Sequence, residues 1–179
     1  MSSPMKKLSM SELGRITPDE FKKISKIPVI VILDNIRSMN NVGSIFRTCD
    51  AFIVEKLYLC GITATPPHKD ITKTALGATE SVEWEYAENV EDLVKALKKE
   101  NIKIYLIEQT DHSIPLHRFQ FSEEKIAVVL GNEVFGVTDN LLPLCDGAIE
   151  IPQHGTKHSL NVTIATGIVL WEAFKHFKN

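Results

Sequence analysis

The sequence lacks several short motifs that mark common enzyme classes. It has no G-x-x-x-x-G-K-[ST] phosphate loop, no G-x-G-x-x-G after the first predicted strand and no G-x-S-x-G nucleophile elbow. These absences argue against a P-loop nucleotide hydrolase, a dinucleotide-dependent enzyme of the usual kind and an α/β-hydrolase. His158 stands beside Ser159, but adjacent residues seldom present a base to a nucleophile, so a hydrolytic triad at this point is weakly supported.

Cysteine and metal-binding patterns are also sparse. The three cysteines, Cys49, Cys60 and Cys145, form no C-x-x-C pair, and their odd number argues against a disulfide framework. A reducing cytoplasm suits this usage best. His154 and His158 are four residues apart, but a glycine between them favours a loop over a helix, so we expect no metal site.

Long apolar runs are missing as well. No run approaches the roughly 20 residues of a membrane span, and the amino terminus has no signal-peptide core. We therefore expect a cytoplasmic protein with no membrane partner. The 179 residues suggest one domain, and their hydrophobic content of 44% and charged content of 24% are ordinary for a globular protein.

The formal net charge is only −3, so the chain is not a bulk polycation. Residues 1–27 nevertheless hold six Lys or Arg and three Asp or Glu, a net charge of +3 against −6 for the remainder. Residues 9–26 are predicted to be helical, with Thr17 to Glu20 as a capping box and Pro28 as the break. We therefore divide the chain into a short basic helical arm, 1–27, and a single domain, 28–179. The arm either touches a polyanion or is a solvated tail.

From residue 29 onward, predicted strands and helices alternate. Strands are expected at 29–33, 56–60, 82–86, 102–107, 125–130 and 147–151, and helices at 40–53, 68–77, 89–100, 138–144 and 159–177. The run at 29–33 is aliphatic throughout, which is typical of a strand buried on both faces. This order predicts an α/β fold with a mostly parallel sheet and helices on both faces.

Two of the predicted helices carry further information. In the helix at 40–53 the apolar residues lie on one stripe, and Arg47 lies well outside it, pointing away from the core. The helix predicted to begin at Ser159 is apolar on nearly all sides. Such a helix is either enclosed in the core or covered by a second subunit, and we favour a homodimer because closed twofold dimers are the commonest oligomers.

Three polar clusters follow or flank the strands, in the ranges 41–47, 130–138 and 149–165. Taken singly, each has an ordinary explanation: Asn41 as a helix cap, Arg47 as a solvated charge, Glu133 as an exposed carboxylate and Ser159 as an N-cap. In an α/β protein, however, loops at the carboxyl ends of strands usually carry the chemistry.

Taken together, the three clusters resemble the three motifs of the SpoU (TrmH-like) RNA methyltransferases of the SPOUT superfamily. The matching strings are N-x-G-x-I-x-R-T-C-D-A-F, then L-G-N-E-x-x-G-V, then I-P-x-x-G-x-x-x-S-L-N-V, in that order. The resemblance covers about residues 28–177. It implies a trefoil-knotted α/β fold, a homodimer, S-adenosyl-L-methionine as methyl donor, and a ribose 2′-hydroxyl of tRNA or rRNA as acceptor.

The resemblance also assigns residues to roles. It implies a catalytic set made of Asn41, Arg47, Glu133, Ser159 and Asn161. It implies that the cofactor is held around a second set, made of Glu108, Leu130, Gly131, Ile151, Ser159 and Leu160.

Arginine is a poor base at its ordinary pKa, so we expect Arg47 to act together with a bound RNA phosphate. Family members that recognise a large RNA often carry an added RNA-binding domain, which is not evident here. The basic residues of the arm, with Arg37, Lys69 and Lys73 on the body, are candidate contacts to the RNA backbone, although solvation explains them as well.

Two other functions stay open. One is a catalytically silent RNA-binding or assembly factor with the same fold, against which the retention of all five catalytic candidates speaks. The other is a small-molecule α/β enzyme, which the missing phosphate-binding glycine pattern disfavours.

Overall fold

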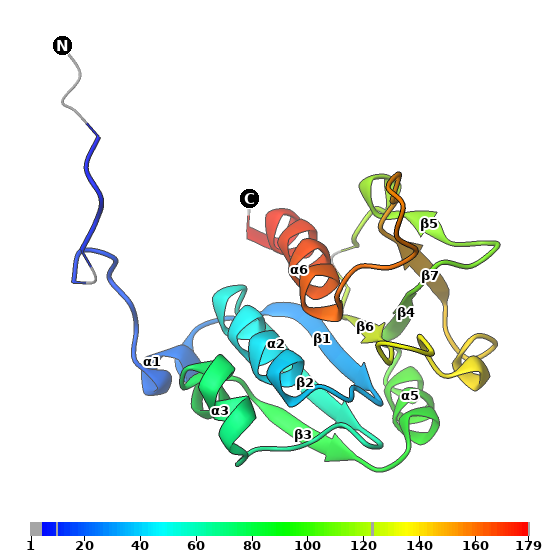
Figure 1. Cartoon of the computed structure of the whole chain (residues 1–179), viewed down its shortest axis with the longest axis horizontal. Coiled ribbons are helices and arrows are strands. Elements are labelled where there is room, and N and C mark those ends of the chain that lie inside the picture. Colours follow the sequence, from blue (N-terminus) through cyan, green and yellow to red (C-terminus); the bar gives the residue numbers. More distant parts are fainter. Residues whose placement is uncertain (1–4, 10, 123, 179) are drawn as a thin grey trace.

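The structure is a computed structural model that describes residues 5–9, 11–122 and 124–178. Its centre is a seven-stranded sheet in the order β3-β2-β1-β6-β4-β7-β5 (Figure 1). Every pairing between these strands is parallel. The strands are β1 (Ile27–Asp34), β2 (Val54–Cys60), β3 (Trp84–Ala87), β4 (Lys103–Ile107), β5 (Ile114–Pro115), β6 (Ile126–Leu130) and β7 (Gly147–Glu150).

Helices cover both faces of the sheet. One face carries α2 (Met39–Ala51), α3 (Lys69–Ala75), α4 (Ala78–Ser81) and α6 (Val162–Lys178), and the other carries α5 (Val90–Lys99) and the 3₁₀ turn η2 (Asp139–Leu141). A short helix α1 (Pro18–Lys23) precedes β1, and a 3₁₀ turn η1 (Leu116–Arg118) follows β5. The mostly parallel α/β fold predicted from the sequence is confirmed, whereas the trefoil knot stays a prediction.

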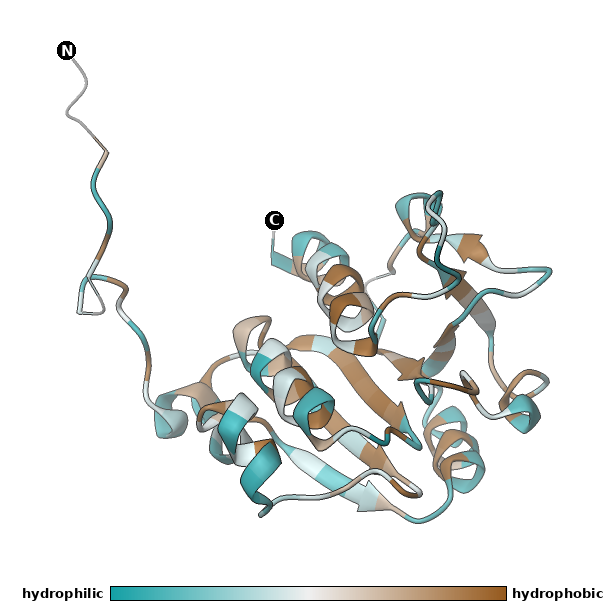
Figure 2. Ribbon diagram, in the orientation of Figure 1, coloured by the Kyte–Doolittle hydropathy of each residue, from teal (hydrophilic) through white to brown (hydrophobic). Residues whose placement is uncertain are grey.

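Strand β1 shows why its aliphatic run is needed. Alternate side chains point to opposite faces of a strand. Val31 and Leu33 accordingly pack with α2 and α6, while Ile30 and Ile32 pack with α5. In Figure 2 β1 is brown over most of its length, in contrast to the paler edge strand β3. A strand at the centre of the sheet must be apolar on both faces, and this one is.

The predicted arm is less helical than expected. Thr17 caps α1 as a capping box, with Glu20 N donating to Thr17 Oγ1 at 3.3 Å and Thr17 N donating to Glu20 Oε2 at 2.8 Å. The helix nevertheless ends at Lys23, and residues 11–14 form a turn. The helix predicted over 9–26 is therefore wrong outside Pro18–Lys23, because the segment before Thr17 is exposed and packs no apolar face; residue 10 lies outside the described residues.

The last helix begins later than predicted. It starts at Val162, and Asn161 supplies the cap, since its Oδ1 accepts a hydrogen bond of 2.8 Å from Thr163 N. Ser159 lies two residues before this cap, so its predicted role in opening the helix is wrong. The predicted helix at 138–144 is reduced to the single turn η2, and the two-residue strand β5 is too short for periodicity to reveal.

Helix α6 keeps part of its apolar surface open in the single chain. Ile164, Ile168 and Trp171 are 54%, 36% and 49% exposed, while Val169 and Leu170 are buried against the sheet. Core packing therefore explains only one side of this helix. None of the helices in the described ranges is both long and apolar enough to span a membrane.

The carboxyl ends of β1, β6, β4 and β7 lie next to one another at one edge of the sheet. The loops that follow these four strands therefore meet at this edge, as expected for a parallel sheet. The second and third polar clusters lie on two of these loops. The first lies on α2, which runs beside α6 on the same face (Figure 1).

Candidate functional site

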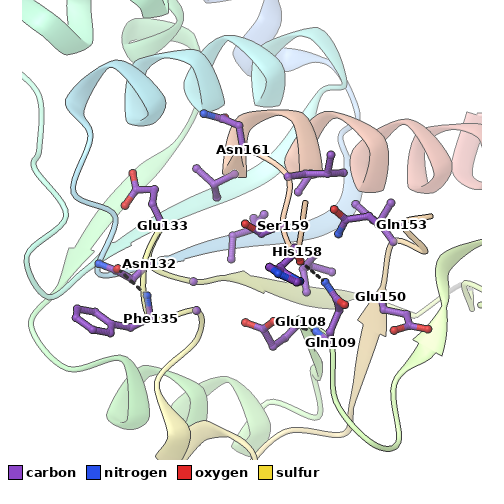
Figure 3. A pocket seen from close by; sticks show the side chains of 18 of the residues that line it. Glu108, Gln109, Asn132, Glu133, Phe135, Glu150, Gln153, His158, Ser159 and Asn161 are labelled. Carbon is purple, nitrogen blue, oxygen red and sulfur yellow. Dashed lines mark hydrogen bonds between the residues drawn. The ribbon is translucent and has the colours of Figure 1, made fainter. Parts of the chain in front are cut away.

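A cavity of about 560 Å³ opens at this edge of the sheet. Its walls come from the loops after β4, β6 and β7 and from the first turn of α6. Figure 3 shows the side chains of these segments converging on it. Its lining includes Ile107, Glu108, Gln109, Leu130, Gly131, Asn132, Glu133, Val134, Phe135, Gly136, Ile149, Glu150, Ile151, Gln153, His158, Ser159, Leu160, Asn161, Val162 and Ala165.

Glu133 joins the second polar cluster to the first. Its Oε2 accepts a hydrogen bond from Arg37 N at 2.9 Å. Its Oε1 accepts from Ser38 N at 3.1 Å and from Asn41 Nδ2 at 2.9 Å. One carboxylate thus binds both the loop after β1 and the start of α2, and it orients the Asn41 side chain.

The same hydrogen bonds set the charge of Glu133. Partial burial opposes ionisation of the carboxyl, but the backbone N–H of Arg37, the Asn41 amide and the backbone N–H of Ser38 stabilise the carboxylate. Their combined effect is larger, so the pKa of Glu133 lies below its usual value. Near neutral pH Glu133 is therefore a negatively charged acceptor and not an acid.

Asn161 connects the third cluster to the other two. Its Nδ2 lies 3.5 Å from Asn41 Oδ1, at the long limit of a hydrogen bond, while its Oδ1 caps α6. Asn41, Glu133 and Asn161 therefore form a chain of side chains drawn from all three clusters. Asn41 does not cap α2, because Ser38 does so by accepting a hydrogen bond from Asn41 N at 3.3 Å.

The other two candidate catalytic residues, Ser159 and Arg47, do not take part in this hydrogen-bonded set. Ser159 lines the cavity on the segment before α6. Arg47 lies on the exposed face of α2, six residues after Asn41, and is not part of the cavity lining. Six helical residues correspond to about 9 Å along the axis. Arg47 points away from the core, as predicted. Within one polypeptide chain, however, it does not join the other four catalytic candidates beside the cavity.

All of the residues expected to hold the cofactor line the cavity. Leu130 and Gly131 lie on one side, and Ile151, Ser159 and Leu160 lie on the other. At Gly131 a Cβ would stand 2.2 Å from both Gly136 C and Val137 N, so no side chain fits there. The lack of a side chain therefore lets the loop after β6 pack closely on itself beside the cavity. Apolar walls with exposed main chain suit an adenosine group.

Glu108 is fixed at the end of β4. Its Oε1 accepts a hydrogen bond of 2.9 Å from Gln109 N, and its Oε2 accepts one of 3.3 Å from Val137 N. Gln109 Nε2 in turn donates to His158 O at 2.9 Å. These bonds tie the loops after β4, β6 and β7 together, so the cavity is already formed in this structure.

Residues that were not assigned a role from the sequence support the site. Asp34 is fully buried, and its Oδ2 accepts a hydrogen bond of 2.7 Å from Thr138 N. Asn132 Nδ2 donates to Asn35 O at 2.7 Å. This network locks the loop after β1 to the loop after β6. A charged residue ending an aliphatic strand was the one signal in the sequence that could have indicated it.

The structure was also searched for groups of side chains that could bind a metal ion. Within residues 5–9, 11–122 and 124–178, no three His, Cys, Asp or Glu side chains stand close enough to hold a metal ion.

The whole chain can also be compared with known proteins. The chain is 34% identical over 149 residues to the tRNA (guanosine(18)-2′-O)-methyltransferase of Aquifex aeolicus, covering 81% of this chain and 68% of that protein. It is 32% identical to the 23S rRNA (guanosine-2′-O-)-methyltransferase RlmB of Escherichia coli K12, covering 83% of this chain and 60% of that protein. The AdoMet-bound rRNA methyltransferase of Sinorhizobium meliloti superposes with a TM-score of 0.80 at 27% identity, covering 92% of this chain and 62% of that one.

The three polar clusters that meet at the cavity all fall inside one family match. Residues 28–171 match the SpoU rRNA Methylase family. On the extent of this match, together with the shared fold, this chain belongs to the SpoU methylase family of SPOUT methyltransferases.

Proposed function

We propose that this protein is an RNA 2′-O-methyltransferase that moves a methyl group from S-adenosyl-L-methionine to a ribose 2′-hydroxyl of tRNA or rRNA. The observation that carries the proposal is the hydrogen-bonded set of Asn41, Glu133 and Asn161 beside a cavity that has both apolar and polar walls. Its relatives are named as 2′-O-methyltransferases of tRNA and of 23S rRNA, which supports the reaction class.

The cavity fits the cofactor. Its volume lies in the range of small-molecule sites, and Gly131 allows the loop after β6 to pack closely on itself at the wall of the cavity. Leu130, Ile151 and Leu160 would hold the adenosine group between apolar walls. When bound, S-adenosylmethionine supplies an activated methyl group. The AdoMet-bound relative from Sinorhizobium meliloti supports this assignment.

The side chains of this protein have to position the ribose 2′-hydroxyl and assist the removal of its proton. Methyl transfer is an in-line displacement, so the main requirement is to hold the attacking oxygen in line with the methyl carbon. Glu133 holds Asn41, and Asn41 and Asn161 offer amide groups beside the cavity. These amides would orient the ribose, and Ser159 would stand at the reacting end.

Arg47 is the proposed partner of an RNA phosphate. No hydrogen bond or ion pair to its side chain occurs among the described residues, so the guanidinium is open to an incoming anion. With a phosphate bound beside it, Arg47 would either take the proton of the 2′-hydroxyl or stabilise the alkoxide through its positive charge. Replacing Arg47 by Lys and by Ala tests this role: near-normal turnover in both variants, with RNA binding intact, would contradict it.

The active form is proposed to be a homodimer. Ile164, Ile168 and Trp171 present an apolar surface on α6 that a second copy would cover. We further propose that residues 28–179 are one methyltransferase domain, that the basic arm, 1–27, contacts RNA, and that the protein is cytoplasmic.

The direct test is to map ribose 2′-O-methyl groups in total RNA from a strain that lacks this protein. The proposal expects a specific 2′-O-methylation in tRNA or rRNA to disappear and to return on complementation. An unchanged map would favour a catalytically silent RNA-binding factor. Calorimetric titration with S-adenosylmethionine would show binding if the cavity is the cofactor site, and no binding would contradict that assignment.

A further inference from the structure

The loop after β6 carries an exposed aromatic ring. Phe135 is 83% exposed, and its neighbour Val134 is 64% exposed. Phe135 lies two residues after Glu133, at the rim of the cavity. Figure 3 shows its ring pointing out of the cavity, away from Glu108 and Gln109. Large apolar side chains in this setting mark interaction surfaces more often than isolated surface residues do.

The loop that carries the ring is pinned at several points. Asn132 is only 9% exposed, and its Oδ1 accepts hydrogen bonds from Val134 N at 2.9 Å and from Phe135 N at 3.1 Å. Asn132 and Gly136 exchange two backbone hydrogen bonds of 2.8 and 2.9 Å, and Gly136 has a φ of +72°. These bonds hold the backbone of Phe135 in place, and its side chain extends from the loop into solvent.

Asn132 also anchors this loop to the loop after β1. Its Nδ2 donates to Asn35 O at 2.7 Å, and the next loop residues lead to the exposed Arg37. Arg37 N binds Glu133, and no hydrogen bond or ion pair to the Arg37 side chain is present in the described part of the chain. An exposed aromatic ring, the Arg37 side chain and the Glu133–Asn41 pair are therefore carried by two loops that are hydrogen-bonded to each other.

We propose that Phe135 is a stacking platform for an unpaired nucleobase of the RNA, at or next to the nucleotide whose ribose is methylated. Every base offers a π-face, so an aromatic ring binds single-stranded RNA without hydrogen-bonding groups of its own. Arg37 would neutralise an adjacent phosphate. This inference rests on the proposed function and adds a residue that selects unpaired RNA at the same site.

The surroundings favour RNA over two other occupants. The cofactor would lie inside the cavity, whereas the ring points out of it (Figure 3). A second copy of the chain would be expected to cover the open apolar surface of α6, which is a different element. Glu133, two residues before Phe135, and Arg37, whose backbone N–H binds Glu133, are both charged, which suits a wet nucleic-acid interface.

The test compares Phe135→Leu with Phe135→Tyr and with Leu76→Ala. Leucine keeps an apolar side chain but cannot stack, and tyrosine keeps the ring. Leu76 is a control because it is 66% exposed and lies outside the cavity lining. The RNA is tRNA and rRNA purified from a strain lacking this protein. Methyl transfer, RNA affinity, S-adenosylmethionine affinity by calorimetry and sedimentation are measured for each variant.

The expected result is specific to RNA. Phe135→Leu should raise the KM and the Kd for RNA roughly ten-fold, with unchanged cofactor affinity and unchanged sedimentation, while Phe135→Tyr and Leu76→Ala stay within about two-fold of the parent. In Phe135→Trp, RNA should quench tryptophan fluorescence more strongly than it does in the parent. This second readout is independent of turnover.

Three results would overturn the stacking role. Equal RNA affinity of Phe135→Leu and the parent would show that the ring does not bind RNA. Weaker cofactor binding would place the ring in the cofactor site, and altered sedimentation would place it between subunits. If the parent protein itself transfers no methyl group to either RNA, the proposed function fails instead, and the two failures are thus distinguishable.

Discussion

The Asn41 side-chain amide donates a hydrogen bond of 2.9 Å to Glu133 Oε1, although 92 positions separate the two residues. This bond joins the loop after β6 to the first turn of α2. Asn161 extends the contact to the start of α6 through its 3.5 Å approach to Asn41. Three segments distant in sequence are therefore held in one constellation, and changes to any member should affect the others.

Replacement of Glu133 by Gln should disrupt this constellation. Both carboxylate oxygens accept hydrogen bonds, so the amide nitrogen of Gln would face a donor at one of the two positions. We expect methyl transfer to fall about a hundred-fold because Asn41 loses its orientation. Stability should fall by about 1 kcal/mol, since the group is partly solvated. Methylation assays and urea unfolding measure the two effects, and full activity of Glu133→Gln would contradict the positioning role.

The same residue predicts a pH dependence of stability. The pKa of Glu133 is lowered in the folded state, so the unfolded chain binds more protons than the folded chain in the acid range. Its stabilising contribution is therefore fully present above the ordinary carboxyl pKa of 4.5 and is lost as the pH falls through the folded value. Unfolding free energies measured from pH 7 down to pH 3 should decline more steeply for the parent than for Glu133→Gln. Parallel curves would show that this carboxylate is not stabilised by folding.

Asn161 has two separable roles. Its Oδ1 caps α6, and its Nδ2 faces Asn41. Asn161→Asp keeps the cap but removes the donor, so we expect stability within about 0.5 kcal/mol of the parent and a large loss of methyl transfer. Asn161→Ala should lose both activity and about 1 kcal/mol of stability. If Asn161→Asp, which keeps the cap, transfers methyl groups as fast as the parent does, Asn161 acts only as a cap.

Gly131 is predicted to be essential for the cofactor cavity. A Cβ at this position would stand 2.2 Å from backbone atoms of Gly136 and Val137, so the loop after β6 would have to move. Gly131→Ala should cost about 1–3 kcal/mol of stability and should weaken S-adenosylmethionine binding. Gly155→Ala is the matched control, because a Cβ there has no neighbour within 4 Å. Equal calorimetric affinities for both variants and the parent would argue against this placement of the cofactor.

The open surface of α6 predicts the oligomeric state. Ile164→Glu places a charge on a residue that is 54% exposed in the single chain, so the folded chain should tolerate it while a covered interface should not. Sedimentation should show a dimer for the parent and a shift to monomer for Ile164→Glu. Leu76→Glu, at a comparably exposed position outside α6, should stay dimeric. A monomeric parent, or a dimeric Ile164→Glu, would contradict the proposed interface.

Local patterns in the sequence predicted much of the fold. The aliphatic run around Val31 predicted the central strand, and Asn89 predicted the start of α5, where its Oδ1 accepts hydrogen bonds from Glu91 N and Asp92 N. These features depend on residues close together in the chain, so composition and spacing reveal them. The prediction of a helix over 9–26 is wrong because the local sequence signals extend beyond Pro18–Lys23, the part that packs against the rest of the protein.

The site was predicted in part. The three motifs supplied Asn41, Glu133 and Asn161, and the structure brings them together. The supporting bond from Asn132 to Asn35 spans 97 positions, so no local pattern could reveal it. The start of α6 was misplaced because Ser159 and Asn161 are both good caps, and only the contact with Thr163 N decides between them.

The most direct test of the account is methyl transfer in a purified system. RNA from a strain lacking this protein is incubated with the protein and S-adenosylmethionine carrying a labelled methyl group, then digested to nucleosides and separated. We predict label on a ribose 2′-oxygen of a single tRNA or rRNA position with the parent protein, and a strongly reduced yield with Glu133→Gln. Label on a base, or no label in either RNA, would contradict it.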